Sequence, residues 1–544
     1  MRVGYHTVSD LPAVLLSSTT TMLLRPALLL ATAAVAAAGG AAPARRPNVL
    51  HLIADDMRPQ LNAFRQPFMR SPYVDALAAG GLTFDAAYTQ FAYCAPSRNS
   101  FMTGRRPERT RCLNFLVDFR QLHGNAWVAM PQFFKNAGYF TSAAGKLYHD
   151  GMDDPLSWSF PSNQTRWIHP GPGDKCDAFK NYCEITNSSA SPFSDEDLVL
   201  HEGLARMREA HASGKPWWVG IGVHRPHHPS RLPAGWTGPE QYPGDVVKSP
   251  AWPIAVVGEP WMSGAYRDGD YVNPALGCPN CSAPAGDTIE YRRWYYAAVS
   301  YADHMLGQAL DLLDELGERD NTIVVFHADH GYQLGELNEW SKKTNTELAT
   351  RVPLVVRVPW KAASAGARTS VRAELVDLYR TLVDLAGLDA AAIQSDVQGV
   401  SLAPLFDAPA APPPALASKA AFSQIGSCAC QNYSHALPDG SNWTGPECNV
   451  GRCFQTNVSS FDFMGYTMAT YDGFRYTAWA RMNATTERVD FGRGVFEELY
   501  DLTADEHDDF DLSAYSVNVA GAPGNAARVA QYREQLEAAV LSWY

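Results

Sequence analysis

The chain has 544 residues, 46% of them hydrophobic and 19% charged, which suffices for a large packed core and excludes a lone binding module or global disorder. Lys and Arg together number 44 and Asp and Glu 57, so the formal net charge is −13. With this acidic balance and no Lys/Arg run, nucleic acid is a poor candidate partner. An anionic substrate would need a locally built cationic pocket or a bound metal.

The N-terminal segment has the layout of a secretory signal. Arg25 precedes an apolar stretch at residues 27–38, and small residues follow. The stretch is shorter than the roughly 20 apolar residues that span a bilayer, so we expect residues 1–46 to be a cleaved signal peptide and leader rather than an anchor. Met22 is an alternative start. No later segment is long enough to cross a membrane, so no stable membrane span is expected.

Sequons and cysteines indicate an oxidising, glycosylating compartment. Seven Asn-x-Ser/Thr sequons predict passage through the secretory pathway, toward secretion or a lysosome-like compartment. Among ten cysteines, we expect Cys176 to pair with Cys183, and Cys278 with Cys281 in a structural disulfide rather than a zinc site. Two cysteines are left over, one of them Cys94. The four C-terminal cysteines, which can pair in three ways, are Cys428, Cys430, Cys448 and Cys453.

Two candidate strands end in clusters of polar residues. Residues 48–54 and 322–327 are mostly apolar runs, as expected of buried parallel strands. Open α/β sheets place their chemistry at the carboxyl ends of such strands. The polar residues that follow the two runs are Asp55, Asp56, Asp329 and His330.

Further elements alternate along the chain. Residues 298–316 have the apolar spacing of a helix and precede the second run. Strands are also expected at 217–223, ending at His224, and at 353–358. Strands that alternate with helices predict an α/β fold with a large, mostly parallel central sheet flanked by helices.

A Pro/Ala-rich stretch at 407–415 marks a boundary between domains. It contains too much proline for a helix or a central strand, so we expect an exposed linker. The linker separates a catalytic domain at 47–406 from a smaller C-terminal α+β subdomain at 416–544. Within that subdomain, residues 466–482 alternate as an antiparallel sheet does, and residues 526–543 have helical periodicity.

One segment carries a specific signature. It reads Cys-Ala-Pro-Ser-Arg at 94–98, and Thr-Gly-Arg follows at 103–105. This pattern resembles the C-x-P-S-R and T-G-R signature of the type I sulfatases, whose fold is alkaline-phosphatase-like. Segments similar to the family's framework also lie at 71–78 and 374–379, and the resemblance extends from residue 48 to about 512.

The resemblance implies a hydrolase of sulfate esters. The cysteine of the signature would be oxidised to Cα-formylglycine during secretion by the formylglycine-generating enzyme, and the hydrate of this aldehyde would attack sulfur. One Ca²⁺ would take part, and the substrate would be a sulfated carbohydrate. The implied metal ligands are Asp55, Asp56, Cys94, Asp329 and His330. The implied catalytic residues are Cys94, Arg98, Lys146, His149, His224 and Lys342.

The resemblance also assigns a role to each of these residues. Arg98, Lys146 and Lys342 would hold the sulfate oxygens, because developing charge there needs neutralisation. His224 would protonate the departing alkoxide, and His149 would accept a proton when sulfate is expelled. Independently of the family, the Asp carboxylates are hard oxygen ligands of the kind that Ca²⁺ prefers.

Each residue also has a structural interpretation. Asp55 and Asp56 could cap a turn, Lys146 and Lys342 could be solvated charges, and Cys94 could be a buried thiol. Their occurrence together with the Asp-His-Gly segment favours a catalytic site. Two other functions stay open: a phosphodiesterase or phosphonate hydrolase of the same superfamily, and a catalytically silent glycan-binding protein.

Three more segments resemble family members that act on sulfated uronic acids. They lie at residues 145–149, 224–227 and 329–342. Arg225 could offer a bidentate fork to a substrate carboxylate, so we expect a 2-O-sulfated uronic acid at a non-reducing end to be preferred. Two differences stand out, since Arg225 replaces a lysine and Leu337 replaces a histidine of those members.

Overall fold

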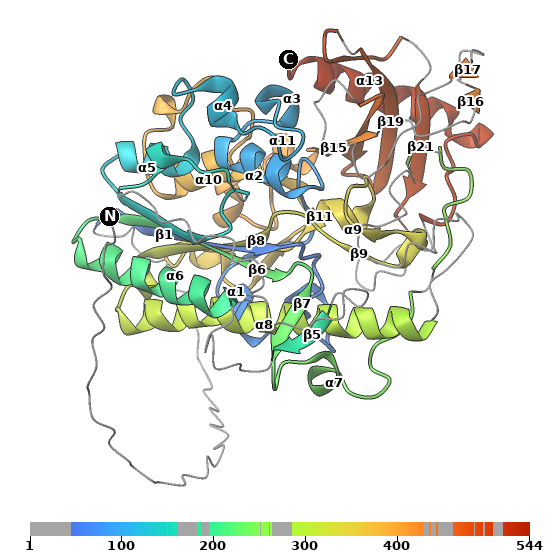
Figure 1. Cartoon of the computed structure of the whole chain (residues 1–544). Coiled ribbons are helices and arrows are strands. Elements are labelled where there is room, and N and C mark those ends of the chain that lie inside the picture. Colours follow the sequence, from blue (N-terminus) through green and yellow to red (C-terminus); the bar gives the residue numbers. More distant parts are fainter. Residues whose placement is uncertain are drawn as a thin grey trace, which may run out of the picture. The chain divides into compact units, whose positions relative to one another are not determined.

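The core of the molecule is a seven-stranded sheet in the order β13-β2-β12-β8-β1-β6-β4, and Figure 1 labels its central strands β8, β1 and β6. In this computed structural model the central strand β1 (Asn48–Asp55) is buried along its whole length. It pairs in parallel with β6 (Trp217–Pro226) and β8 (Thr322–Ala328), and β4 (Phe140–Gly145) pairs in parallel with β6. The predicted mostly parallel α/β sheet is therefore confirmed. The structure describes residues 45–149, 151–159, 182–185, 195–250, 252–260, 262–263, 285–427, 435–436, 442–443, 461–483, 485–492, 495–503 and 515–544.

One edge of this sheet departs from the parallel pattern. The predicted strand at 353–358 forms as β12 (Leu354–Arg357), but it runs antiparallel to both β8 and β2 (Leu82–Phe84). The described segment between β8 and β12 contains short strands and helical turns of at most four residues, without the long crossover helix that usually connects parallel strands. Beyond β2, β13 (Ala367–Thr369) restores a parallel pairing.

Helices cover both faces of the sheet. In Figure 1, α1 (Pro72–Ala79), α6 (Asp195–Ala212) and α8 (Ala285–Glu315) lie on one side, and α6 and α8 both contact β6. On the other side lie α2 (Cys94–Thr103), α5 (Met130–Asn136) and α10 (Asp377–Leu385). The predicted helix at 298–316 is thus the second half of α8.

The C-terminal part contains a second, antiparallel sheet. Its strands are β15 (Ala421–Ser427), β18 (Phe463–Ala469), β19 (Phe474–Asn483), β20 (Arg488–Asp490) and β21 (Phe496–Asp501). The helix α13 (Ala526–Leu541) covers it with residues spaced three and four apart, namely Val529, Tyr532, Leu536 and Val540. Both the sheet and the helix were predicted from periodicity. The domain boundary at 407–415 stays a prediction.

Short elements complete the described chain. The helices are α3 (Pro107–Thr110), α4 (Phe119–His123), α7 (Gly238–Gln241), α9 (Glu347–Thr350) and α11 (Pro414–Ala417). The strands are β3 (Ala87–Tyr88), β5 (Tyr182–Ile185), β7 (Ser230–Pro233), β9 (Gln333–Leu334), β10 (Trp340–Ser341), β11 (Arg351–Val352), β14 (Ala373–Glu374), β16 (His435–Ala436) and β17 (Asn442–Trp443).

Some predictions concern segments outside the described residues. Cys183 is disulfide-bonded, but its predicted partner Cys176 lies outside them, as do the other six cysteines of the predicted pairs. Cys94 and Cys112 are unpaired and buried. The leader up to residue 44 is not described either. Among the helices that are described, none combines the length and the apolar character needed to cross a membrane.

Candidate active site

The carboxyl ends of two neighbouring strands bring three carboxylates together. Asp55 ends β1, Asp56 follows it, and Asp329 directly follows β8. Because Ala54 lies opposite Ala328 in the parallel register, the two ends are level. Asp56 has a left-handed backbone (φ 61°), and its N–H donates to Asp329 Oδ1 over 3.2 Å. All three side chains are buried.

A close contact between two glycines places Lys146 beside these carboxylates. Gly145 ends β4 with φ 73° and lies opposite Gly222 of β6. A Cβ atom on Gly145 would lie 2.1 Å from the Gly222 carbonyl oxygen, so only glycine permits this approach. The next residue, Lys146, donates its N–H to that same oxygen and brings its Nζ to 2.5 Å from Asp55 Oδ2.

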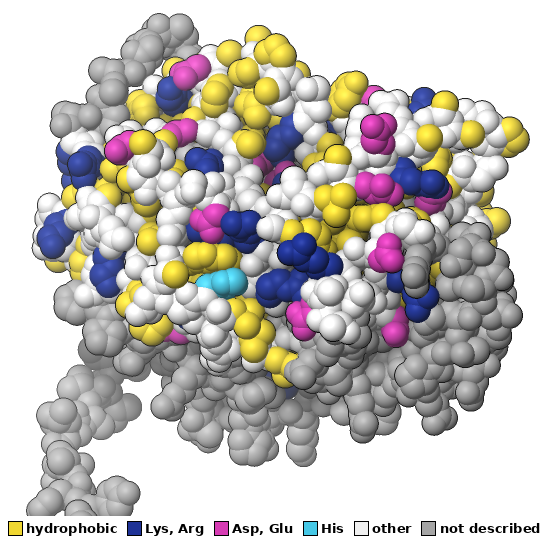
Figure 2. All heavy atoms as spheres, turned by 90° about the horizontal axis from the view of Figure 1, so that it is seen from above, with side chains coloured by type: hydrophobic (Ala, Val, Ile, Leu, Met, Phe, Trp, Pro, Cys, Tyr) yellow, Lys and Arg dark blue, Asp and Glu magenta, His cyan; other side chains and the backbone are white. Residues whose placement is uncertain are grey.

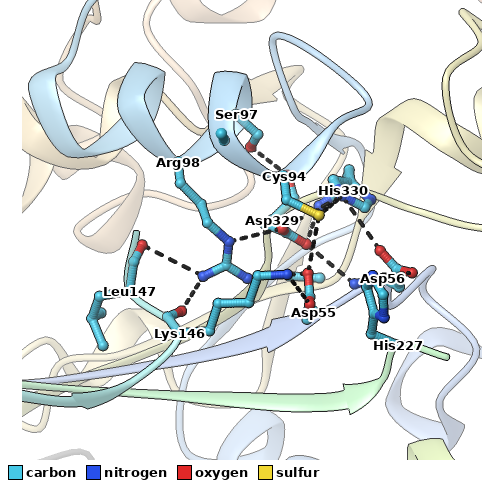
Figure 3. A network of polar contacts seen from close by, with 12 residues as sticks. Asp55, Asp56, Cys94, Ser97, Arg98, Lys146, Leu147, His227, Asp329 and His330 are labelled. Atoms are coloured by element: carbon cyan, nitrogen blue, oxygen red, sulfur yellow. Dashed lines mark hydrogen bonds and ion pairs between the residues drawn. The ribbon is translucent and has the colours of Figure 1, made fainter. Parts of the chain in front are cut away.

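Cys94 lies at the start of the buried helix α2, where the helix dipole favours negative charge. Its Sγ lies 3.3 Å from His330 Nε2, 3.3 Å from Lys342 Nζ and 3.6 Å from Asp55 Oδ1. Figure 3 shows Asp55 and His330 beside the sulfur. Burial raises the pKa of the Cys94 thiol to about 12, so an unmodified thiol would be a poor nucleophile at neutral pH.

Arg98 lies one helical turn after Cys94 and links the carboxylates to one another. Its Nε donates to Asp329 Oδ2 over 2.9 Å, and its Nη2 to Asp55 Oδ1 over 3.3 Å. Nη1 donates to the backbone carbonyl of Lys146 (Figure 3). The guanidinium is fully buried, and it therefore ties α2 to the ends of β1, β4 and β8.

The carboxylates of the site have strongly perturbed acidities. Burial raises the pKa of Asp56 to about 6, against the opposing effect of Lys342, which contacts its Oδ1. Burial likewise raises the pKa of Asp329 to about 7, against the effect of Arg98. Asp55 is also buried, but Lys146 and other cations hold its pKa well below the usual range. Two of the three carboxylates would thus gain from an additional cation.

The same atoms form a candidate metal site. Two overlapping groups of side chains could each hold an ion, because within each group the ligand atoms all lie within 4.8 Å of one another. One group is Asp55, Cys94, Asp329 and His330, and the other is Asp55, Asp56, Cys94 and His227. His330 Nδ1 lies 3.0 Å from the Gly331 carbonyl oxygen, to which it must donate, so Nε2 presents a lone pair to the site. The carboxylate oxygens of these two groups are ligands that a hard cation such as Ca²⁺ prefers.

Two histidines of the His-Arg-Pro-His segment lie beside Asp55. His224 Nδ1 is 3.0 Å from Asp55 Oδ2, and the His224 and His227 rings stack with centroids 4.4 Å apart. Burial lowers the pKa of His224 to about 3, so this ring is neutral near pH 7. His227 was not among the predicted site residues, although its place three residues after His224 in the motif was a signal for it.

His149 lies at the side of the site, where its ring stacks on Phe115 at 3.8 Å between centroids. Burial, followed by Lys146, lowers the pKa of His149 to about 2. A ring with so low a pKa is neutral but a weak base, so the role of proton acceptor stays a prediction. Phe115 stacks in turn on Tyr93, the residue before Cys94, at 4.0 Å.

Arg225 has a different environment from the one expected for a substrate ligand. It is 5% exposed, and it donates to two backbone carbonyls of its own loop, those of Arg231 (from Nε, 3.2 Å) and His227 (from Nη1, 3.0 Å). These contacts stabilise the loop that carries His224 and His227. Leu337 is fully buried, with φ 55°, and donates its N–H to the Trp252 carbonyl over 2.7 Å.

On the face seen in Figure 2, Lys and Arg side chains gather near the middle, among acidic and hydrophobic ones. An acidic chain can therefore present cations locally. Inside the molecule the same holds at the site, where Arg98, Lys146 and Lys342 surround Cys94 and the three carboxylates.

The fold and the site together define a hydrolase of alkaline-phosphatase-like architecture, and comparisons with known proteins agree. The family described as Sulfatase matches residues 47–388, more than half of the chain. Iduronate 2-sulfatase of Mus musculus is 34% identical over 389 residues, covering 63% of this chain and 69% of the relative, and that of Homo sapiens is 32% identical over 384 residues with the same coverage. The chain belongs to the sulfatase family.

Solved structures share the fold at lower identity. The phosphonate monoester hydrolase of Silicibacter pomeroyi aligns with a TM-score of 0.64 at 21% identity, covering 92% of this chain and 96% of that chain. A protein solved in complex with its substrate D-glucosamine-2-N,6-O-disulfate aligns with a TM-score of 0.64 at 20% identity, covering 92% and 98%. These likenesses bear on the fold alone.

Proposed function

We propose that this sulfuric ester hydrolase removes O-sulfate groups from sulfated sugars, with a Cα-formylglycine made from Cys94 and one Ca²⁺ at its centre. The observation that carries the proposal is the position of Cys94. Its sulfur lies within 3.6 Å of a carboxylate, an imidazole and an ammonium group, at the positive end of α2. An unmodified thiol there is a weak nucleophile, whereas a hydrated aldehyde would offer a hydroxyl at the same point.

The metal would be held by the carboxylates of Asp55, Asp56 and Asp329, with His330 or His227 beside them. When bound, Ca²⁺ would neutralise charge at the sulfate oxygens and lower the pKa of a hydroxyl at position 94. The raised pKa values of Asp56 and Asp329 support a cation here, because both carboxyls are easier to ionise beside one.

The side chains of the site supply the remaining functions. Lys146 and Lys342 can turn their ammonium groups from Asp55 and Asp56 toward sulfate oxygens, since both already lie at the site. Arg98 is held by two carboxylates, so its charge acts at a fixed place. This arrangement stabilises negative charge that develops during sulfuryl transfer.

Proton transfer falls to the two histidines at the sides of the site. His149 would accept the proton that leaves a hydroxyl at position 94. Because its pKa of about 2 makes it a weak base in the resting site, it would do so only when the negative charge of bound substrate raises that pKa. His224 would donate a proton to the departing sugar oxygen. Since burial keeps His224 neutral in the resting site, it would take up that proton only when an anionic substrate lies against it.

For the substrate, we propose a 2-O-sulfated uronic acid at a non-reducing end. The support is the identity of 32–34% to two iduronate 2-sulfatases, together with the segments at 145–149, 224–227 and 329–342. Arg225 would act on this specificity either through a substrate carboxylate or through the loop carbonyls to which it donates. The protein would meet the formylglycine-generating enzyme in the secretory pathway and end in a secreted or lysosome-like location.

The first test is the mass of the tryptic peptide that contains position 94. Protein made in a secretory host should carry an aldehyde there, about 18 Da lighter than cysteine. Cys94→Ser should keep its fold but lose nearly all turnover of an aryl sulfate. Wild-type protein that carries only a thiol, yet hydrolyses sulfate esters at full rate, would refute the mechanism. An unmodified thiol with no turnover would instead indicate a silent glycan-binding protein.

A parallel assay separates sulfatase from phosphatase chemistry. The likeness to phosphonate monoester hydrolases shows a common fold, and sulfate and phosphate groups share their tetrahedral shape. We expect kcat/KM to be higher for the aryl sulfate than for the matched aryl phosphate and phosphonate. The reverse order would assign the site to phosphoryl transfer.

A further inference from the structure

Two fully buried histidines face each other behind the carboxylates of the site. They are His51 in β1 and His327 in β8, and their Nε2 atoms lie 2.7 Å apart. His51 lies opposite Val325, and Ile53 lies opposite His327. Because alternate residues of a strand point to the same face, both imidazoles project from the same face of the sheet. Neither histidine is part of the site described above.

The hydrogen bonds determine which nitrogens carry protons. His327 Nδ1 lies 2.8 Å from the Ala328 carbonyl oxygen, which can only accept, so Nδ1 is the donor. In a neutral ring Nε2 of His327 must then accept, and Nε2 of His51 must donate. This leaves His51 Nδ1 without a proton, and this atom indeed has no hydrogen-bond partner. Burial lowers the pKa of both rings, in agreement with two neutral imidazoles.

The pair holds the peptide group that precedes Asp329. The carbonyl of the Ala328–Asp329 peptide accepts from His327, and its N–H donates to the Ala54 carbonyl over 3.2 Å. Both polar atoms of one peptide are thus bound, which leaves little freedom to rotate it. The Asp329 side chain starts from this peptide and accepts from Arg98, Asp56 and His330.

Aromatic contacts connect the pair to the other elements that build the site. The ring of Phe101, in α2, lies edge-on to His327 at 5.0 Å and tilted to His51 at 6.4 Å. Trp218, in β6, lies edge-on to His51 at 5.5 Å. The pair therefore contacts all four elements that carry Asp55, Asp329, His224 and Cys94.

We propose that His51 and His327 are positioning residues, whose mutual hydrogen bond and contact with the Ala328 carbonyl orient the Asp329 carboxylate and so determine how tightly the site binds its divalent cation. The inference rests on the metal site of the proposed function. Burying two imidazoles is costly unless their polar atoms are hydrogen-bonded, so their hydrogen bonds alone do not indicate a function, and the position of the backbone contact does. Here the one contact to the backbone is made next to a candidate metal ligand.

The test uses two substitutions of His327, each of which keeps one of its two hydrogen bonds. An Asn side chain places an amide where Nδ1 lies, so His327→Asn retains the donor to the Ala328 carbonyl. A Gln side chain places its amide near Nε2, so His327→Gln retains the contact to His51 only. The full chain is stripped of metal and titrated with Ca²⁺ by calorimetry, with thermal unfolding and aryl-sulfate kcat/KM measured in parallel.

We expect His327→Gln to bind Ca²⁺ about 10- to 100-fold more weakly, as is typical when an outer partner of a metal ligand is lost, and His327→Asn, which keeps the backbone contact but loses the bond to His51, to lose less affinity. Ile323→Ala is the matched control, because Ile323 is also buried in β8 but lies at its other end. It should lower the unfolding temperature and leave the Ca²⁺ affinity unchanged.

The proposal is overturned if His327→Gln binds Ca²⁺ as the wild type does, or if His327→Asn loses as much affinity as His327→Gln. Should His327→Gln not fold, His51→Phe tests the pair from the other strand, since it removes the imidazole that donates to His327. Weakened Ca²⁺ binding supports the proposal, and wild-type binding contradicts it. Wild-type protein that binds no Ca²⁺ would instead show that the proposed metal is wrong.

Discussion

Two buried charge clusters differ in the acidity of their carboxyl groups, apart from Asp55, whose pKa is held low like that of Glu336. In the catalytic cluster, burial raises the pKa of Asp56 to about 6 and of Asp329 to about 7. In the second cluster, Arg58 and Arg292 contact Glu336 Oε1 at 2.9 and 2.5 Å and, against the effect of burial, hold the pKa of Glu336 at about 2. Arg58 follows Asp56 by only two residues.

The difference lies in how the cations are shared. Glu336 accepts from two guanidinium groups and from the Leu334 N–H, so two positive charges face its single negative charge. In the catalytic cluster, three cations serve three carboxylates, and Lys342 also lies 3.3 Å from Cys94 Sγ. A compensated cluster stabilises a loop, whereas an undercompensated one is prepared for a metal ion and an anionic substrate.

The largest effect is expected in the catalytic cluster, at two of the proposed metal ligands. Asp55→Asn or Asp329→Asn should remove Ca²⁺ from the purified protein and with it nearly all turnover, because the remaining ligands cannot balance a divalent ion. Mass spectrometry of the purified protein measures the loss of Ca²⁺, and aryl-sulfate kinetics measure the loss of turnover. The control is Asp303→Asn, a buried carboxyl that accepts from Val74 N at 2.7 Å and should leave metal content unchanged. Stoichiometric zinc without calcium in active enzyme would contradict the assignment.

The compensated cluster should respond in stability rather than in metal binding. Glu336→Gln leaves the buried Arg58 without its counter-charge, and breaking a buried ion pair in this way costs about 3 to 5 kcal/mol of unfolding free energy. Denaturant unfolding checks this value, and calorimetry should find an unchanged Ca²⁺ affinity in the folded variant. A variant with normal stability and weakened Ca²⁺ binding would remove the distinction between the clusters.

The difference in unfolding free energy between the wild type and Glu336→Gln should become smaller at low pH. The folded pKa of Glu336 is about 2, below the usual 4.5, so ionised Glu336 stabilises the fold fully above about pH 4.5 and progressively less as the pH falls toward 2. The unfolding free energy of the wild type should therefore fall more steeply than that of Glu336→Gln over this range. Parallel curves for the two proteins would show that Glu336 does not titrate as its ion pairs require.

The smallest effect concerns Arg225, a cation that lies beside the catalytic cluster but belongs to neither of the two clusters. Arg225→Ala should reduce transition-state binding of a 2-O-sulfated uronide by about 1 to 3 kcal/mol, as expected for a lost charge-assisted hydrogen bond, and affect a neutral aryl sulfate much less. Measurement of kcat/KM on both substrates decides whether Arg225 acts on the uronide or only through its own loop. Equal losses on the two would assign Arg225 to holding the loop of His224 and His227.

The sequence by itself determined the main strands and helices and the family. The apolar runs at 48–54 and 322–327 form the predicted strands, because long buried strands leave a pattern that neighbours along the chain do not obscure. The C-x-P-S-R segment forms the first turns of α2, and the acidic and basic residues assigned to the site do gather around Cys94. Such features are local in the chain, or belong to a motif whose spacing is retained.

Only the tertiary structure decided how distant residues meet. The reversed direction of β12, the place of His227 next to Asp56, and the use of Arg225 by its own loop depend on contacts between segments. Lys342 meets Asp56 across 286 residues of sequence. The His51–His327 pair likewise has no signature in the chain, since it arises from the register of two strands. Periodicity records which face a side chain takes, but packing and register decide which partner it finds there.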